Sequence, residues 1–133
     1  MAVKKQDGLS KNSRAERDGL KKELGRGGEQ QARKFLKKQG YKIIETNYKH
    51  PLGEVDIIAR KGEVLAFIEV KTRLSDNFGI PSEAVDCRKR HRYIQAAKYY
   101  FLNREPDCVV RFDIIEIFRG QLNHIENAFY EGQ

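Results

Sequence analysis

Residues 53–71 read GEVDIIARKGEVLAFIEVK, two apolar runs separated by Gly62 and Glu63. A glycine at the first central position of a two-residue connection favours a type II′ turn between antiparallel strands. Such a turn fixes which residues face each other across the hairpin. The predicted partners are Lys61 with Val64, Asp56 with Glu69, and Glu54 with Lys71.

This register brings two carboxylates and an ammonium group together. Opposed side chains on antiparallel strands have Cβ atoms roughly 4.5–5.5 Å apart, and like charges placed there are destabilising. Period-two alternation also puts Glu69 and Lys71 on one face of a strand that is otherwise apolar. A divalent cation such as Mg²⁺ or Mn²⁺ would remove the repulsion, because these ions prefer hard oxygen ligands. We therefore predict a metal site at Asp56 and Glu69, with Lys71 placed to position a phosphate or the attacking water. The alternative is an exposed sheet face that carries a salt-bridge network.

The rest of the chain predicts an α/β fold around this hairpin. Residues 1–18 are polar and predict a flexible tail, followed by a single domain over residues 19–133. Apolar spacing predicts one mixed sheet flanked by helices, in the order α-β-β-β-α-β-β. The predicted helices are Leu20–Gln39 and Ser82–Asn103, and the predicted strands are Tyr41–Asn47, Glu54–Arg60, Val64–Lys71, Val109–Phe118 and Gln121–Glu126.

The chain is basic, with 26 Lys and Arg against 19 Asp and Glu and a net charge of +7. A basic surface attracts polyanions such as nucleic acid, although the same charge can serve solubility alone. Cys87 and Cys108 match no metal or redox spacing, and no apolar run is long enough to span a bilayer. We therefore expect a cytoplasmic protein with reduced thiols and no membrane partner.

The second predicted helix carries a dense basic cluster, RKRHR at residues 88–92. Basic helical surfaces contact phosphates and so position a protein on nucleic acid. The alternative is a solvated charged face. Asp113 lies in an apolar strand, where it could anchor Arg111 or a neighbour of the active site; we expect a structural role.

GEVD at 53–56 and EVK at 69–71 resemble the paired motifs of the PD-(D/E)xK nuclease superfamily, whose restriction-endonuclease-like core has the order α-β-β-β-α-β. More narrowly, the chain resembles the YraN-like family of small bacterial proteins, which are described as predicted endonucleases. The further matching segments are GRGGEQQARKFL at 25–36, GYKIIETNYK at 40–49, FIEVKTR at 67–73 and RFDII at 111–115. Val55 stands where the motif's name has proline, a position that varies in the superfamily.

The resemblance implies a set of site residues. Asp56 and Glu69 would bind metal together with the backbone carbonyl of Val70, and Lys71 would be the catalytic lysine. Glu29 matches a first-helix glutamate that archaeal Holliday-junction resolvases of this superfamily place near the same metals. From the residues alone, Glu29 could face either the sheet or the solvent. The expected phosphate contacts are Arg73 and Lys89, which the resemblance places near the catalytic strand, and the neighbouring Arg88 and Arg92.

Together these observations predict an Mg²⁺- or Mn²⁺-dependent endonuclease that hydrolyses phosphodiester bonds in DNA, with branched DNA among the candidate substrates. Two alternatives stay open: a nucleic-acid-binding module that keeps the nuclease fold but cuts little or nothing, and a nuclease that processes RNA. A homodimer is compatible with an endonuclease that acts on branched DNA, since two symmetric cuts need two active sites.

Overall fold

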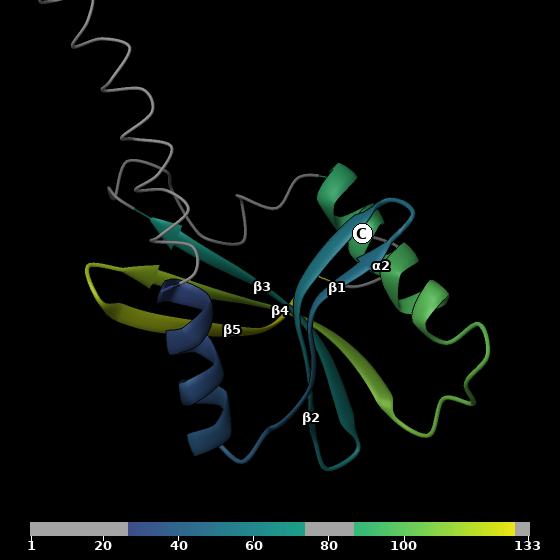
Figure 1. The fold of residues 1–133 in the computed structure, drawn as a ribbon, viewed down its shortest axis with the longest axis horizontal. Coiled ribbons are helices and arrows are strands. Elements are labelled where there is room, and N and C mark those ends of the chain that lie inside the picture. The colour runs from purple at the N-terminus through teal and green to yellow at the C-terminus, as the bar shows by residue number, and fades with distance from the viewer. Residues whose placement is uncertain (1–26, 74–86, 130–133) are drawn as a thin grey trace, which may run out of the picture.

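The computed structural model describes residues 27–73 and 87–129 (Figure 1). Its centre is a five-stranded mixed sheet with the spatial order β1-β2-β3-β4-β5. Only the β3–β4 pair is parallel; the other neighbours are antiparallel. The strands are β1 (Lys42–His50), β2 (Gly53–Lys61), β3 (Val64–Arg73), β4 (Val109–Phe118) and β5 (Gln121–Phe129).

One helix packs on each face of the sheet. The first helix, over residues 27–38 in the described part, buries Ala32 and Leu36 against Ile68 and its neighbours. Helix α2 (Cys87–Tyr100) buries Tyr93 and Ala96 against the other face, together with Phe67. Figure 1 shows these two helices on opposite sides of the strands. The predicted α/β fold with a central mixed sheet flanked by helices is confirmed, and it is consistent with a restriction-endonuclease-like fold.

The boundaries of most elements follow the local sequence signals. Gly40 ends the first helix with φ +93°, and the Tyr41 N–H donates to the Leu36 carbonyl at 2.9 Å, as in a Schellman motif. Strand Val109–Phe118 has the predicted limits, whereas β1 and β5 each run three residues further than expected. Helix α2 ends at Tyr100, three residues before the predicted end. The predicted tail over residues 1–18 and the predicted start of the second helix at Ser82 lie outside the described residues.

The β2–β3 hairpin has the predicted turn and register, up to a point. Gly62 has φ +60° and Glu63 does not have a positive φ, as a type II′ turn requires. The strands pair from Lys61↔Val64 to Ile57↔Ile68, as predicted. The ladder ends there, however. The two further predicted pairs, Asp56 with Glu69 and Glu54 with Lys71, are not strand partners.

No helix in the described ranges is long and apolar enough to cross a membrane.

Candidate functional site

The Asp56 side chain accepts a backbone hydrogen bond from β3 at the point where the β2–β3 ladder ends. In this hairpin every second pair exchanges backbone hydrogen bonds, so the next such pair beyond Ile57↔Ile68 would join Val55 and Val70. Instead, the Val70 N–H donates to Asp56 Oδ2 at 2.8 Å. The N–H and C=O of a strand residue point to the same neighbour, so the Val70 carbonyl is directed toward the same opening. Asp56 therefore caps the end of the β2–β3 ladder, where the two strands separate and the Val70 backbone groups face the gap between them.

Glu69 and Asp56 are positioned in different ways. Glu69 lies two residues after Phe67, which belongs to the core cluster beneath α2, so Glu69 follows that face of the sheet. In β2 the alternation breaks at Asp56, because Val55 belongs to the cluster beneath α2 and Ile57 to the cluster beneath the first helix. The Asp56 carboxyl is held instead by the Val70 N–H at the end of the ladder.

Asp56 lies in a strongly acidic environment. Burial raises the pKa of Asp56 to about 7, against the hydrogen bond from Val70, which lowers it. The carboxylates of Glu29, Glu69 and Glu54 raise the same pKa further. Negative charge from Asp56 and Glu69 also adds to the effect of burial in raising the pKa of Tyr93. The site thus holds four carboxyl groups whose mutual repulsion a cation would relieve.

Two lysines provide positive charge at this site. Lys89 Nζ forms an ion pair with Glu69 Oε1, and the Glu69 side chain is buried. Burial lowers the pKa of Lys71, and the positive charges of Lys89 and Arg73 lower it as well, against Glu69 and Glu116, which raise it. A lysine with a lowered pKa is suited to proton transfer as well as to binding phosphate.

The first helix brings Glu29 to the same site from the opposite face of the sheet. Burial raises the pKa of Glu29, and the Glu54 carboxylate also raises it, whereas Arg33 lowers it. Gly28 permits this approach, because a Cβ there would clash with the Thr72 hydroxyl on β3. Of the two orientations left open by sequence, the structure places Glu29 toward the sheet, near Asp56.

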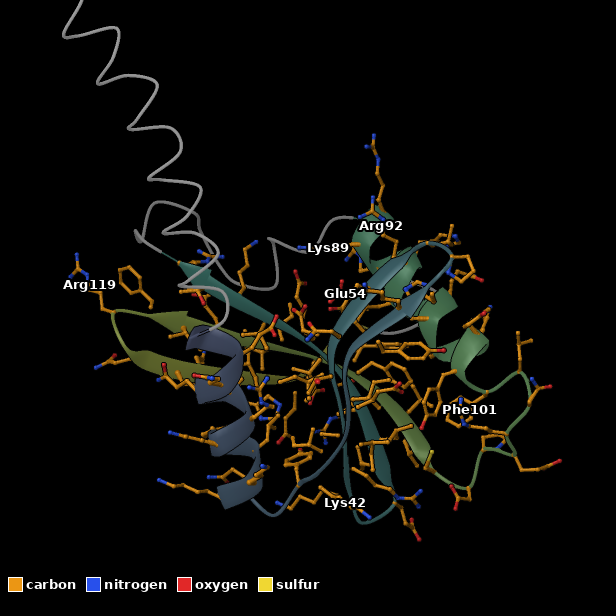
Figure 2. All side chains as sticks on the ribbon, in the orientation of Figure 1. Lys42, Glu54, Lys89, Arg92, Phe101 and Arg119 are labelled. Atoms are coloured by element: carbon orange, nitrogen blue, oxygen red, sulfur yellow. The ribbon has the colours of Figure 1, made fainter. Side chains whose placement is uncertain are left out.

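The predicted phosphate contacts lie in two different settings. Arg88 and Arg92 are exposed on α2, with the Arg92 side chain beside Gly53 at the start of β2. Figure 2 shows Glu54, Lys89 and Arg92 gathered where the first turns of α2 meet this strand. Arg73 lies two residues beyond Lys71, the predicted end of its strand. It belongs to β3 and is buried, with its Nε 3.1 Å from Glu116 Oε2.

The donor set has the chemistry that Mg²⁺ or Mn²⁺ prefers. Among the described residues, no three His, Cys, Asp or Glu side chains converge in an arrangement that could hold a metal ion. The expected set differs in kind, since it joins the Asp56 and Glu69 carboxylates to the Val70 backbone carbonyl. All three are oxygen ligands, which hard divalent cations prefer. Burial and then the neighbouring carboxylates raise the pKa of Asp56, and a bound cation would oppose both effects. These residues therefore fit a hard divalent cation.

Sequence analysis missed two contributors to this site. Glu54 raises the pKa of both Asp56 and Glu29, and the Tyr93 side chain hydrogen-bonds the Asp56 backbone. Both had a usable signal. Glu54 lies two residues before Asp56, which in a regularly alternating strand would place both on one side. Tyr93 follows Lys89 by four residues, which places both on one face of a helix.

A second polar cluster surrounds Asp113 on the other side of the sheet. This fully buried carboxylate accepts two hydrogen bonds from Arg111, both 2.8 Å, one from His124 Nε2 at 2.8 Å and one from the Asn127 N–H at 2.9 Å. Burial alone would raise the pKa of Asp113, but these hydrogen bonds lower it below its usual value. The contact between Asp113 and Arg111 is confirmed. The residues that hydrogen-bond Asp113 all belong to β4 and β5, which fits a structural role.

The fold and the acidic, lysine-bearing site together define an α/β protein of the restriction-endonuclease-like type. The chain belongs to the uncharacterised protein family UPF0102, whose model matches residues 28–117. This confirms the resemblance to the YraN-like family, which groups with the PD-(D/E)xK nucleases.

Several bacterial relatives match most of the chain. A UPF0102 protein of Dictyoglomus thermophilum is 53% identical over 105 residues, which cover 78% of this chain and 89% of the relative. A UPF0102 protein of Clostridium perfringens strain SM101 is 48% identical over 111 residues, covering 83% and 88%. One from Caldicellulosiruptor saccharolyticus is 44% identical over 117 residues, covering 82% and 98%.

Proposed function

We propose that this protein is a nuclease that hydrolyses phosphodiester bonds in DNA with the help of Mg²⁺ or Mn²⁺. The observation that carries the proposal is the half-buried Asp56 carboxyl, which has a pKa of about 7 among three further carboxylates, one of which, Glu69, interacts with two lysines. Such a cluster is costly unless it binds a cation, and perturbed groups of this kind concentrate at functional sites.

Each residue of the site would have a definite task. Asp56, Glu69 and the Val70 carbonyl would hold the metal, which when bound supplies neutralising charge and an activated water. Lys71 would orient the water or a phosphate oxygen from the same strand. Glu29 would accept hydrogen bonds from water at the edge of the site. Lys89, Arg88 and Arg92 would bind the flanking phosphates, with Lys89 able to exchange its Glu69 partner for a phosphate oxygen.

A cleavage panel tests this proposal. Linear duplex, single-stranded, flapped and four-way DNA are incubated with Mn²⁺ and either the wild-type protein or Asp56→Asn. We expect cleavage of at least one DNA by the wild type and a loss of more than about 100-fold in the variant. Glu63→Gln, which changes an exposed carboxyl at the hairpin turn, is the matched control and should cleave normally. Equal cleavage by Asp56→Asn would reject the assigned site.

A second candidate function is a nucleic-acid-binding module that does not cut. The ion pair between Lys89 and Glu69 favours it, because the lysine already supplies a cation to one carboxylate. Calorimetry separates the two candidates: binding of Mn²⁺ by the wild type and not by Asp56→Asn supports the nuclease. If neither protein binds Mn²⁺, with or without DNA, the binding module is the better description.

The choice of DNA rests on the net charge of +7 and on family membership, neither of which distinguishes DNA from RNA. An assay in which equal amounts of labelled RNA and DNA compete for one protein sample decides this. Preferential cleavage of the RNA would turn the proposal into an RNA-processing nuclease that uses the same residues.

A further inference from the structure

A hollow of about 250 Å³ lies beside the candidate site, between the β1–β2 turn and the end of α2. Figure 1 shows this turn lying against α2. The turn contributes Pro51 and Leu52, and the helical side contributes Gln95, Lys98, Tyr99 and Leu102. The lining is therefore mainly apolar and aromatic, with one ammonium group at its margin.

The walls of the hollow are unusually exposed for apolar groups. Leu52 is 50% exposed, Tyr99 45% and Leu102 69%. Among the described residues, only Ile44 and Val109 are other large apolar side chains that reach such exposure. Clustering of three such groups around one depression is typical of a binding surface, whereas single exposed apolar residues are ordinary.

His50 lines the same hollow with its ring. Its ring stacks on Tyr48 with a centroid distance of 6.3 Å, and its Nδ1 accepts a hydrogen bond from the Leu52 N–H at 3.4 Å. With Nδ1 as the acceptor, Nε2 carries the proton. Nε2 is buried and has no hydrogen-bond partner among the described residues. Because this atom is buried, it is the His50 ring and not its N–H that lines the hollow. The hollow thus combines aromatic and aliphatic walls, the groups on which a planar heterocycle stacks.

The position of the hollow connects it to the carboxylates. On α2, Lys89 and Tyr93 contact the acidic site, and Tyr99 follows Tyr93 by six residues, about 9 Å along the helix axis. On the strand side, Leu52 is followed directly by Gly53 and Glu54, which lead to Asp56. Tyr99 follows Lys89 itself by ten residues, about 15 Å along the helix axis. Since stacked nucleotides are about 3.4 Å apart along one strand, the hollow lies about four or five nucleotides from a phosphate held at Lys89.

The surrounding charge favours a nucleic acid as the occupant. Helix α2 carries no acidic residue, and its basic side chains run from Arg88 to Lys98 along the path between the two places. A second copy of this chain would bring the same basic helix against itself, with like charges opposed. A phosphodiester strand complements that charge and carries bases that can stack on an aromatic wall.

We propose that this hollow binds an unpaired nucleobase of the strand whose phosphate lies at the carboxylate–lysine site. The inference rests on the proposed function for the position of that phosphate. In a paired duplex both faces of a base are stacked on its neighbours, so the base cannot enter. The preferred substrate therefore has unpaired nucleotides about four or five positions from the cut, as at a flap, a gap or a branch. Because every base has a π-face, the preference is for strand state and not for sequence.

Binding in Ca²⁺ tests the inference separately from cleavage. Two DNAs are compared by fluorescence anisotropy: a duplex with a gap of about five nucleotides, matched to the spacing along α2, and the same duplex fully paired. A 2-aminopurine in the gap reports stacking. We expect Tyr99→Ala to weaken binding of the gapped DNA about 5- to 150-fold, the range of one aromatic–base stack, and to change duplex binding less than about twofold. Tyr99→Phe should restore binding. Val109→Ala, at an exposed apolar residue elsewhere, should have no effect.

Three outcomes would overturn the inference: no effect of Tyr99→Ala on the gapped DNA, equal loss on both DNAs, or a change of oligomeric state in sedimentation, which would make the hollow a contact between copies. Failure of the proposed function has a different signature. If gapped DNA binds in a Tyr99-dependent way but is not cleaved in Mn²⁺, the base site is supported and the nuclease is rejected. If cleavage is equal on gapped and paired DNA and is unaffected by Tyr99→Ala, the nuclease is supported and the base site is rejected.

Discussion

Replacing Asp56 by Asn should stabilise the metal-free protein at alkaline pH while it removes the proposed metal site. The pKa of Asp56 is about 7 in the folded protein, against a usual value of 3.8, so the folded state binds a proton more tightly than the unfolded state does. The Asp56 contribution to stability is therefore full below about pH 4 and is lost as the pH rises to 7. Asparagine keeps an acceptor for the Val70 N–H and does not titrate.

The magnitude follows from the two pKa values. At about 1.4 kcal/mol per pKa unit, the advantage of Asp56→Asn over the wild type grows from about 1 kcal/mol at pH 4.5 to about 4 kcal/mol at pH 8. Urea unfolding in EDTA at these two pH values measures it, with Glu63→Gln as the control that should show no such gap. Addition of Mn²⁺ at pH 8 should stabilise only the wild type. An advantage that is equal at both pH values, or absent at pH 8, would refute the reasoning.

Three further predictions test the surroundings of the site. Gly28→Ala should destabilise the protein by about 1–3 kcal/mol in urea unfolding, because its Cβ meets the Thr72 hydroxyl; Gly27→Ala, with open space around it, should be neutral or stabilising by up to about 1 kcal/mol. Asp113→Asn should cost about 3–5 kcal/mol in the same assay at pH 7, since it leaves Arg111 without its buried anion; the lowered pKa of Asp113 means that this difference shrinks only below about pH 4. Affinity for Mn²⁺, measured by calorimetry, should rise about tenfold per pH unit below pH 7 and level off above it, as Asp56 gives up its proton.

Local chemistry explains which parts of the fold the sequence could predict. The type II′ turn at Gly62 and the end of the first helix at Gly40 depend on glycines with positive φ, so their positions were readable. The hairpin register could be predicted from the turn. The point at which the ladder ends could not, because there the Asp56 side chain accepts a hydrogen bond that a backbone carbonyl would normally accept.

Long-range packing explains what the sequence left out of the site. Arg73 is held by Glu116, which lies on a different strand, and no spacing within either segment announces that pair. Likewise, the side on which Glu29 lies depends on how closely Gly28 approaches Thr72, a contact between the first helix and β3. Local spacing placed residues within one strand or helix well, whereas for Glu29 and Lys89, which come from the helices, the place near the site came from the family resemblance.

The arrangement of the site ties its chemistry to the integrity of the whole fold. The first helix supplies Glu29 from one face of the sheet, and α2 supplies Lys89 from the other, while Asp56 and Glu69 come from strands that separate between them. Repulsion among the carboxylates opposes this assembly, and the packing of Leu36 on one face and Tyr93 on the other has to offset it. A change that loosens either helix should therefore disperse the acidic cluster and restore an ordinary pKa to Asp56 before the sheet itself unfolds. Because the site draws residues from helices on both faces of the sheet, we expect it to be lost before the sheet is.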